Sequence, residues 1–281
     1  MRAAVIGQPI SHSRSPALHR AAYTQLAIGC GYEAIEVAPA QLEAFVDGLR
    51  GDRDWAGLSV TMPHKAAMVP LMDAATDAVR ALGVLNTVTF GDGVLVPRLT
   101  GHNTDVAGVA NALRNAGAGL PASAVVVGGG GTAAAALAGL QLLGATRADI
   151  FVRNPGRAAQ LQLIGAALGL AAVVKPLAGL AEAVVGADVI VSTLPPRAAD
   201  PIAAELAAAR VRVDGILLDV AYDPWPSALA ASWAHGGGTV VSGLEMLLYQ
   251  AVEQVRLFHP SASLAPDVIN VMCDAVGIPR R

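Results

Sequence analysis

One stretch of sequence, VVVGGGGTAAAAL at residues 125–137, restricts the possible folds of this 281-residue chain more than any other. Its valines predict a buried strand, its glycines a tight turn and its alanines a closely packed helix. Glycines at 128, 130 and 131 tolerate positive φ angles and let the backbone approach a phosphate, and the helix start adds N–H donors. An ordinary turn is the alternative, because Ala133 replaces the last glycine of the usual G-x-G-x-x-G pattern. The order strand, glycine turn, helix favours a dinucleotide site.

The next predicted strand ends at VRNPGRA, residues 152–158, where an NAD site usually carries Asp or Glu for the ribose 2′-hydroxyl. Here Arg153 and Arg157 flank Asn154 instead. Either arginine alone is more often a surface charge, but two guanidinium groups at this location favour a 2′-phosphate. The sequence therefore predicts NADP as the cofactor.

The composition fits layers of helices and strands. Hydrophobic residues make up 54% of the chain and aromatic residues only 4%, so small aliphatic side chains must fill the cores. The uncharged stretch between Arg114 and Arg147 is long enough to cross a bilayer, but it contains Pro121 and four consecutive glycines. A strand, a turn and a buried helix explain this stretch better than a membrane helix. The N-terminal apolar run is too short for a signal peptide, so we expect a soluble cytoplasmic protein.

Charge and cysteine content exclude other classes. A formal net charge of −3 gives no basic footprint for nucleic acid. Two cysteines, Cys30 and Cys273, support neither a disulfide framework nor a zinc site, and a reducing compartment fits. The histidines show no metal-ligand spacing, so no metal is expected. The expected partner is a small-molecule substrate, and a homodimer stays an open alternative.

Strands and helices alternate twice along the chain, which predicts two α/β units that meet near residue 104. The first unit is expected to contain a helix over residues 64–82, interrupted at Pro70, and a hairpin that turns at Gly91-Asp92-Gly93. The other strands of the first unit are expected at residues 3–7, 32–38 and 57–62. Those of the second are expected at 122–127, 148–154, 187–195, 215–222 and 238–243, followed by helices over 244–258 and 265–276.

Four segments of the first unit place polar residues where a strand opens into a loop: ISHSRSP, SVTMPHK, LNT and GHNTD. Ligands of α/β proteins bind at such strand ends. Ser11, Ser13 and Ser15 offer hydroxyls for a carboxylate or polyol, although helix capping explains them equally well. Asn86 also fits a hairpin entry, and Asp105 also fits a helix N-cap.

Lys65 is the most suggestive of these residues. Pro63 should end the strand just before it, so the lysine stands at the mouth of a loop. If Asp105 converges on it, the pair can position an ammonium to exchange a proton with a carbonyl or hydroxyl oxygen. A solvated loop lysine is the alternative. His64 beside it is more simply read as a loop histidine than as a group that tunes Lys65.

Taken together, these segments resemble the shikimate dehydrogenase family over nearly the whole chain. The matching motifs, in order, are GQPISHSRSP, VTMPHK, Asn86-Thr87, NTD at 103–105, the glycine loop, the VRNPGR stretch, a D-x-x-Y segment and GLEMLLYQ. The resemblance implies an α/β fold with two domains. Residues 1–104, completed by helices over 245–281, would bind the substrate. Residues 105–244 would form a Rossmann-like NADP domain, separated from the first by a cleft.

The resemblance also implies a reaction, the reversible NADPH-dependent reduction of 3-dehydroshikimate to shikimate in aromatic amino-acid biosynthesis. Lys65 would be the acid/base group, with Asp105 orienting it. The substrate would be bound by Ser13, Ser15, Thr61, Asn86, Asp105, Tyr222 and Gln250. The cofactor would be bound by Asp77, Gly128, Gly129, Gly130, Gly131, Thr132, Ala133, Arg153, Asn154, Arg157, Thr193, Leu194, Val220 and Gly243.

Two departures from the family pattern and two competing functions bear on this reading. The glycine loop reads GGGGTA rather than GAGGA, and Val152 replaces the first asparagine of the N-R-T motif. A quinate/shikimate dehydrogenase that uses NAD would share the fold, but the arginines after the second strand argue against it. A ligand sensor without catalysis should lack Lys65 or Asp105, and both are present.

Overall fold

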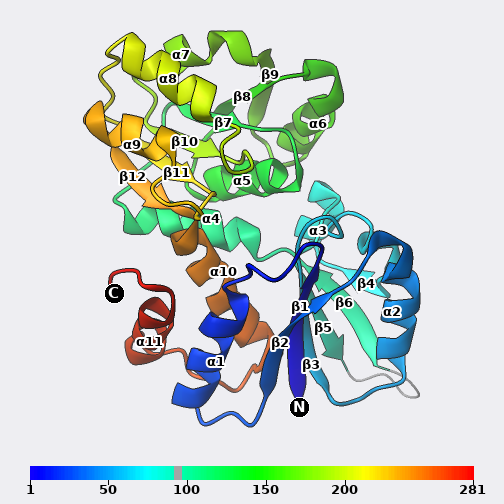
Figure 1. Ribbon diagram of the computed structural model, residues 1–281. Coiled ribbons are helices and arrows are strands. Elements are labelled where there is room, and N and C mark those ends of the chain that lie inside the picture. The colour runs from blue at the N-terminus through cyan, green and yellow to red at the C-terminus, as the bar shows by residue number, and fades with distance from the viewer. Residues whose placement is uncertain (92–96) are drawn as a thin grey trace. The chain divides into compact units, whose positions relative to one another are not determined.

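The computed structural model describes residues 1–91 and 97–281 of the chain. These residues divide into two compact units, one formed by Met1–Thr104 with Gln250–Arg281 and the other by Asp105–Tyr249. The second boundary lies inside helix α10 (Gly243–Phe258), because this helix runs unbroken past residue 245, where the sequence-based division was drawn. Figure 1 shows the elements of both units.

The first unit is built on a mixed sheet with the strand order β2-β1-β3-β5-β6-β4. Its strands are β1 (Arg2–Gly7), β2 (Gly31–Glu36), β3 (Trp55–Val60), β4 (Ala74–Ala75), β5 (Thr87–Gly91) and β6 (Arg98–His102). Strands β2 and β3 run parallel to β1, whereas β5 runs antiparallel to both β3 and β6. The expected hairpin pairing is therefore present, with Gly91 opposite Arg98. Its predicted turn residues Asp92 and Gly93 lie outside the described residues.

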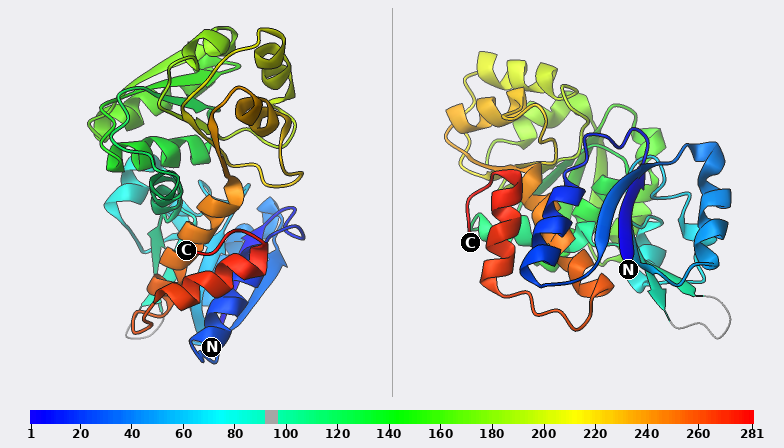
Figure 2. Two further views of the ribbon diagram at one scale, coloured as in Figure 1. Left: turned by 90° about the vertical axis from the view of Figure 1, so that its left-hand side faces the viewer. Right: turned by 60° about the horizontal axis from the view of Figure 1, so that its bottom comes forward.

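Helices cover both faces of this sheet. They are α1 (Ser15–Gln25), α2 (Leu42–Arg50), α3 (Asp77–Leu82), the part of α10 from Gln250 on, and α11 (Pro266–Val276). Figure 2 shows α1 and α11 side by side on one face and α2 on the other. Val46 of α2 packs with Ile6 and Leu58 of the strands in one core. On the opposite face the ring of Phe258 occupies the space where Gly57 has no β-carbon, which seats the end of α10 on β3.

The helix expected over residues 64–82 is wrong for most of its length. Only α3, at its end, is helical, and the rest forms turns, a short 3-10 helix over Val69–Leu71 and strand β4. Pro70 provides no backbone donor, and the Asp73 carboxylate accepts from the Leu99 N–H at 2.8 Å. This side-chain bond to β6 and an ion pair with Arg50 hold residues 72–76 extended beside the sheet, and the Thr76 hydroxyl then caps α3.

The second unit is a fully parallel sheet with the order β12-β11-β10-β7-β8-β9. Its strands are β7 (Ala124–Val127), β8 (Arg147–Val152), β9 (Ala171–Pro176), β10 (Val189–Ser192), β11 (Ile216–Asp219) and β12 (Thr239–Ser242). The chain order reverses between β7 and β10, as in doubly wound sheets. Strand β9 was not predicted, because it is a partly exposed edge strand without a clear alternation of polar and apolar residues.

Helices pack on both faces of this sheet as well (Figure 1). One group contains α4 (Asp105–Asn115), α5 (Gly131–Leu142) and α6 (Gln160–Ala167), and the other contains α7 (Leu180–Ala183), α8 (Asp200–Ala208) and α9 (Ala228–His235). The residues of α5 from Ala133 to Leu140 are all buried, and Gly139 lets Val109 of α4 pack directly on the α5 backbone. The predicted α/β fold class is confirmed.

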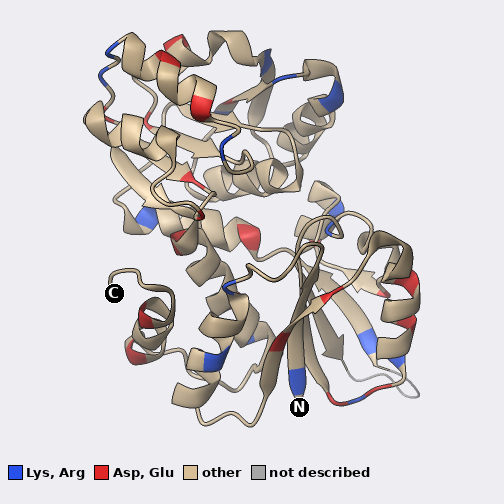
Figure 3. Cartoon of the chain, viewed as in Figure 1, with Lys and Arg blue, Asp and Glu red and all other residues tan. Residues whose placement is uncertain are grey.

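Charge and hydropathy of the folded chain agree with its composition. In Figure 3 the acidic and basic residues are interspersed over the described parts of both units. Among the residues that the structure describes, no helix is long and apolar enough to cross a membrane.

Candidate functional site

The glycine loop of the second unit follows β7 and opens helix α5. Gly128 has a φ of +117°, and a β-carbon there would overlap the hydroxyl of Thr193, which donates to the Val127 carbonyl at 3.0 Å. Gly130 precedes the helix, whose first residue is Gly131, and a β-carbon on Gly130 would meet nothing within 4 Å. A phosphate can therefore approach the backbone here and accept from the first N–H groups of α5.

The other predicted cofactor residues of this unit follow the carboxyl ends of its strands. Thr193 and Leu194 follow β10, Val220 follows β11, and Gly243 follows β12. Because the carboxyl ends of parallel strands lie on one side of the sheet, these residues lie on the same side as the glycine loop. This side contains the point where the strand order reverses between β7 and β10. An added β-carbon on Gly243 would overlap the Val220 carbonyl, so the two backbones touch.

The loop after β11 is anchored by a buried carboxylate that sequence reasoning did not single out. Asp219 accepts from the Ser227 hydroxyl at 2.5 Å and from the Ala221 N–H at 3.3 Å. Burial raises the pKa of the Asp219 carboxyl, against the effect of these hydrogen bonds. Asp219 thus fixes the start of the segment that carries Val220 and Tyr222.

The predicted 2′-phosphate residues follow β8. Arg153, Asn154 and Arg157 are all exposed, and the Asn154 carbonyl accepts from the Arg157 N–H at 3.2 Å in a short 3-10 helix, Pro155–Ala158. The turn thus holds Arg153 and Arg157, four residues apart in the chain, at the end of the strand with both side chains exposed. They are therefore available to an anionic ligand.

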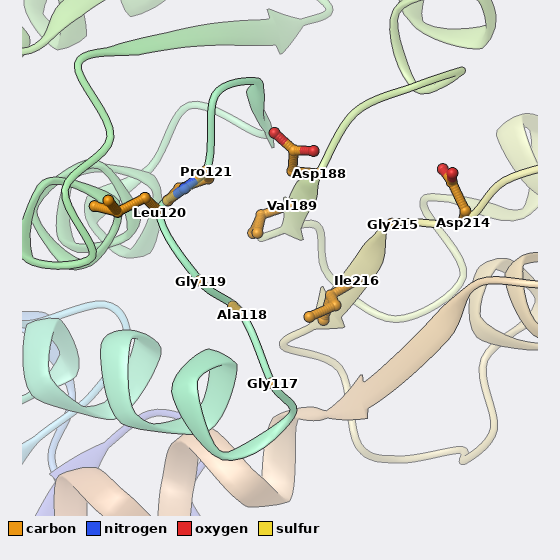
Figure 4. Close-up of a pocket in the computed structure, with 10 residues that line it drawn as sticks. All are labelled: Gly117, Ala118, Gly119, Leu120, Pro121, Asp188, Val189, Asp214, Gly215 and Ile216. Atoms are coloured by element: carbon orange, nitrogen blue, oxygen red, sulfur yellow. The ribbon is translucent and has the colours of Figure 1, made fainter.

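The second unit also has a cavity at the amino ends of its strands, on the side of the sheet opposite to the glycine loop. It encloses about 290 Å³ and is lined by residues 117–121 and by the starts of β10 and β11 (Figure 4). One carboxylate on its wall, Asp188, accepts from the N–H groups of Ala122 and Ser123, each at 2.8 Å. These contacts lower the pKa of Asp188 and tie the segment before β7 to β10. The cavity is thus remote along the strands from the glycine loop.

In the first unit, a buried polar cluster surrounds Asn86. The Asn86 side chain accepts from the Thr104 N–H at 2.7 Å and from the Thr87 hydroxyl at 2.8 Å. Its amide nitrogen donates to the Thr104 hydroxyl at 2.9 Å and to Gln250 Oε1 at 3.3 Å. Two predicted substrate residues, Asn86 and Gln250, are therefore brought together although they are far apart in the sequence.

Backbone hydrogen bonds bring Lys65 to the same place. The Thr61 N–H donates to the Ile6 carbonyl at 2.9 Å, so the chain stays paired with β1 beyond the end of β3. The Lys65 carbonyl then accepts from the Leu85 N–H at 3.0 Å, directly before Asn86. The half-buried Lys65 is thus a neighbour of Asn86 in the fold.

The serine motif lies between β1 and α1. Ser15 is buried at the first position of α1, and its N–H donates to the Ser13 hydroxyl at 3.3 Å. His64 has a separate role, because its buried ring donates to the Val37 carbonyl at 2.7 Å. That bond accounts for the histidine without any function beside Lys65, in line with the simpler expectation.

Two further predicted residues belong to the second unit and one to the first. Asp105 is the first residue of α4 and Tyr222 follows β11, so both belong to the second unit. Asp77 belongs to the first unit, where it starts α3 with an exposed side chain that pairs with Arg80. Sequence reasoning missed Thr87, Thr104 and Gln254, which hold Asn86 and its neighbours; only the helical spacing of Gln254 from Gln250 pointed to the last.

The reversal of strand order beside a glycine loop defines a doubly wound α/β protein of the dinucleotide-binding class. A family model described as "Shikimate dehydrogenase substrate binding domain" matches residues 5–88. The chain is 39% identical over 270 residues to the shikimate dehydrogenase (NADP(+)) of Rubrobacter xylanophilus, an alignment covering 94% of this chain and 91% of the relative. The chain belongs to the shikimate dehydrogenase family.

Solved structures agree. The crystal structure of Mycobacterium tuberculosis shikimate dehydrogenase is 41% identical, with a TM-score of 0.85 and coverage of 98% of both chains. The shikimate 5-dehydrogenase of Thermus thermophilus, solved in complex with NADP(H) and shikimate, is 28% identical with a TM-score of 0.81. The alignment covers 98% of this chain and 99% of that one. The predicted family membership is confirmed.

Proposed function

We propose that this protein is an NADP-dependent shikimate dehydrogenase, which interconverts shikimate and 3-dehydroshikimate and serves aromatic amino-acid biosynthesis. The observation that carries the proposal is the cluster in the first unit formed by Asn86, the neighbouring Lys65 and Gln250 of α10. It combines amide donors and acceptors with one ammonium, which suits a ligand rich in hydroxyls next to a proton-transfer step. The first unit binds the substrate and the second binds NADP.

The second unit fits the cofactor by the shape of its glycine loop. The crowding of Gly128 against Thr193 leaves room only for a backbone without a side chain, and the N–H groups of α5 and the guanidinium groups of Arg153 and Arg157 suit phosphates. NADP supplies the hydride acceptor for shikimate oxidation and, as NADPH, the hydride donor for the reverse reaction.

The residues of the first unit bind and orient the substrate. Ser13 and Ser15 bind its carboxylate, and Thr61, Asn86 and Gln250 bind its hydroxyls together with Tyr222. As the neutral amine, Lys65 takes the proton of the hydroxyl that becomes the ketone, and as the ammonium it returns that proton in the reverse direction, while Asp105 orients the side chain. The oxidation then balances as loss of one hydride to the cofactor and one proton to Lys65.

The cysteines bear on the location of the protein, whereas its oligomeric state requires a measurement. Cys30 and Cys273 are both free thiols, which supports the cytoplasm as the location. The molar mass in solution, measured by light scattering, decides between a monomer and the homodimer that was left open.

The direct test is reduction of NADP⁺ in the presence of shikimate, followed by the absorbance of NADPH. Parallel reactions contain quinate in place of shikimate, and NAD⁺ in place of NADP⁺. We expect the highest kcat/KM for shikimate with NADP⁺. A preference for quinate and NAD⁺ would assign the chain to the alternative dehydrogenase. Binding of shikimate without any turnover would indicate the sensor instead.

A further inference from the structure

Gln254 is a buried amide that none of the proposed roles uses. It lies on α10 one helical turn after Gln250, and its side chain is 1% exposed. Its oxygen accepts from the Ser59 hydroxyl at 2.9 Å and from Nε2 of His19 at 3.1 Å. Its nitrogen donates to the Thr87 hydroxyl at 2.9 Å and to the Asn86 carbonyl at 3.4 Å. Such a residue satisfies all its polar atoms within the first unit.

The orientation of the Gln254 amide is fixed by its neighbours. The Asn86 backbone carbonyl can only accept, so it requires the amide nitrogen on its side. A flipped amide would place two oxygens against each other in the core, at the cost of a buried unsatisfied acceptor. The amide oxygen must therefore face Ser59 and His19.

The groups on that side are donors to Gln254. Burial lowers the pKa of His19 to about 3, so the ring is neutral near pH 7 and its Nε2 carries the single proton. The His19 ring stacks on Tyr32 with centroids 4.0 Å apart, and the Tyr32 hydroxyl donates to Ser59 at 2.7 Å. Because the Ser59 oxygen accepts the proton of Tyr32, the Ser59 hydroxyl directs its own proton at the amide oxygen of Gln254. The hydrogen bonds thus run in one direction toward Gln254.

The direction continues through Thr87 to Asn86. Because Thr87 accepts from Gln254, its own proton is directed to Asn86 Oδ1 at 2.8 Å. The Thr104 N–H donates to the same oxygen at 2.7 Å. With its oxygen held by two donors, the Asn86 amide turns its nitrogen toward Gln250 and Thr104 Oγ1. A substrate hydroxyl that replaces the longer contact, the one with Gln250 at 3.3 Å, would meet the donor end of the amide.

We infer that Gln254 is a positioning residue, which acts through Thr87 to keep the amide nitrogen of Asn86 directed at a substrate hydroxyl. The inference rests on the proposed function, because it assumes that Asn86 binds shikimate. Gln254 itself does not contact the substrate. It sets the hydrogen-bond polarity of a residue that does, and so affects recognition of the substrate more than the chemical step.

The test uses steady-state kinetics of the full chain with shikimate and NADP⁺. Gln254→Met keeps the approximate shape of the side chain but removes both polar atoms, and Thr87→Val removes the hydroxyl that accepts from Gln254 and donates to Asn86. We expect KM for shikimate to rise about tenfold in each variant, the effect of one buried hydrogen bond to an oriented polar group. KM for NADP⁺ should stay within about twofold, because the cofactor belongs to the other unit. Thr87→Ser should restore wild-type KM.

A double variant distinguishes a positioning role of Gln254 from a general weakening of substrate binding. If Gln254 acts through Thr87, the Gln254→Met/Thr87→Val protein should have a KM for shikimate no higher than the worse single variant. The inference would be overturned if the double variant showed the product of the two single-variant increases in KM for shikimate. It would also be overturned if KM for shikimate and KM for NADP⁺ rose equally. Glu253→Gln, on the same helix, is the matched control and should leave both KM values unchanged.

The outcomes also separate this inference from the proposed function. A wild-type protein that does not turn over shikimate contradicts the proposed function itself. An active wild type with an unchanged KM in Thr87→Val contradicts only the role of Gln254 and Thr87. Should Gln254→Met fail to fold, Thr87→Val and its rescue by Thr87→Ser still decide the question, because threonine and valine have the same shape.

Discussion

The α-carbon of Gly243 lies against the backbone carbonyl of Val220, so closely that a β-carbon at residue 243 would overlap the carbonyl oxygen. Neither partner can yield easily. Gly243 starts a 16-residue helix, and Val220 directly follows β11, an interior strand of a parallel sheet. The contact therefore fixes where α10 begins relative to the carboxyl ends of β11 and β12.

Replacing Gly243 by alanine should damage this edge of the sheet. The added methyl group must displace backbone on one side, which we expect to cost about 1–3 kcal/mol of unfolding free energy. We also expect a raised KM for NADP⁺, because the displaced residues are proposed cofactor contacts. Urea unfolding and cofactor kinetics measure the two effects. Gly119→Ala is the control, since nothing lies within 4 Å of a β-carbon there. Equal stability of the two variants would contradict the prediction.

Lys65→Ala should lose turnover while it still binds shikimate. Loss of a proton-transfer group typically lowers kcat by about 10²–10⁴-fold, whereas the hydroxyl contacts of Asn86 and Gln250 remain. Kinetics give kcat, and titration calorimetry gives the affinity for shikimate. The assigned role of Lys65 would fail if kcat stayed near the wild-type value.

Arg153→Ala and Arg157→Ala should weaken the preference for NADP⁺ over NAD⁺. A charge-assisted hydrogen bond to phosphate contributes about 1.5–3 kcal/mol, so KM for NADP⁺ should rise about tenfold or more for each arginine that contacts it. KM for NAD⁺, which lacks the 2′-phosphate, should change little. Increasing salt should weaken NADP⁺ binding to the wild type more than to the variants. Equal effects on both cofactors would argue against a 2′-phosphate site at β8.

His19 should make the stability of the protein depend on pH below neutrality. Its pKa falls from 6.5 in the unfolded chain to about 3 in the folded protein, because burial disfavours the charged ring. Between these values only the unfolded chain binds the proton, so stability decreases as the pH falls from 7 toward 3. This linkage predicts a loss of about 2 kcal/mol between pH 7 and pH 5.

The contribution of His19 is obtained by comparison with His19→Gln, which does not titrate. Burial lowers the pKa of His102 and His259 too, so the change of the wild-type unfolding free energy with pH includes the contributions of these histidines. Only the difference in slope between the two proteins is assigned to His19. Urea unfolding at pH 7 and pH 5 measures it, and parallel slopes for wild type and variant would refute the prediction.

Most strands were predictable because apolar runs ended at glycine or proline. The run before Gly128 and the run before Pro63 each mark a strand of the sheet. Where tertiary contacts override the local pattern, prediction failed. Residues 64–76 have the composition of a helix, but residues 64–71 form turns and a short 3-10 helix, and the Asp73 side chain bonds to β6 and holds the residues around it extended. Such a bond depends on a partner that the local sequence does not contain.

The candidate site was predictable in its members but not in its arrangement. Spacing and resemblance pointed to Asn86 and Gln250, whereas the hydrogen bond between them depends on how α10 packs beside β5. Thr87 lies in the Asn86-Thr87 motif and Gln254 lies one helical turn after Gln250, but neither position indicated a role, because a threonine in a strand and a glutamine in a helix are ordinary. Their importance lies in the direction of their hydrogen bonds, which only the folded geometry reveals.

The division of the first unit into two chain segments has a consequence for the order of folding during synthesis. Its sheet is complete by Thr104, but Gln254 is made only after the whole second unit has been synthesised. Until then the hydroxyls of Ser59 and Thr87 lack the amide that later joins them. The second unit is continuous and can fold first, whereas the hydrogen-bond cluster around Asn86 cannot be completed until α10 has been synthesised.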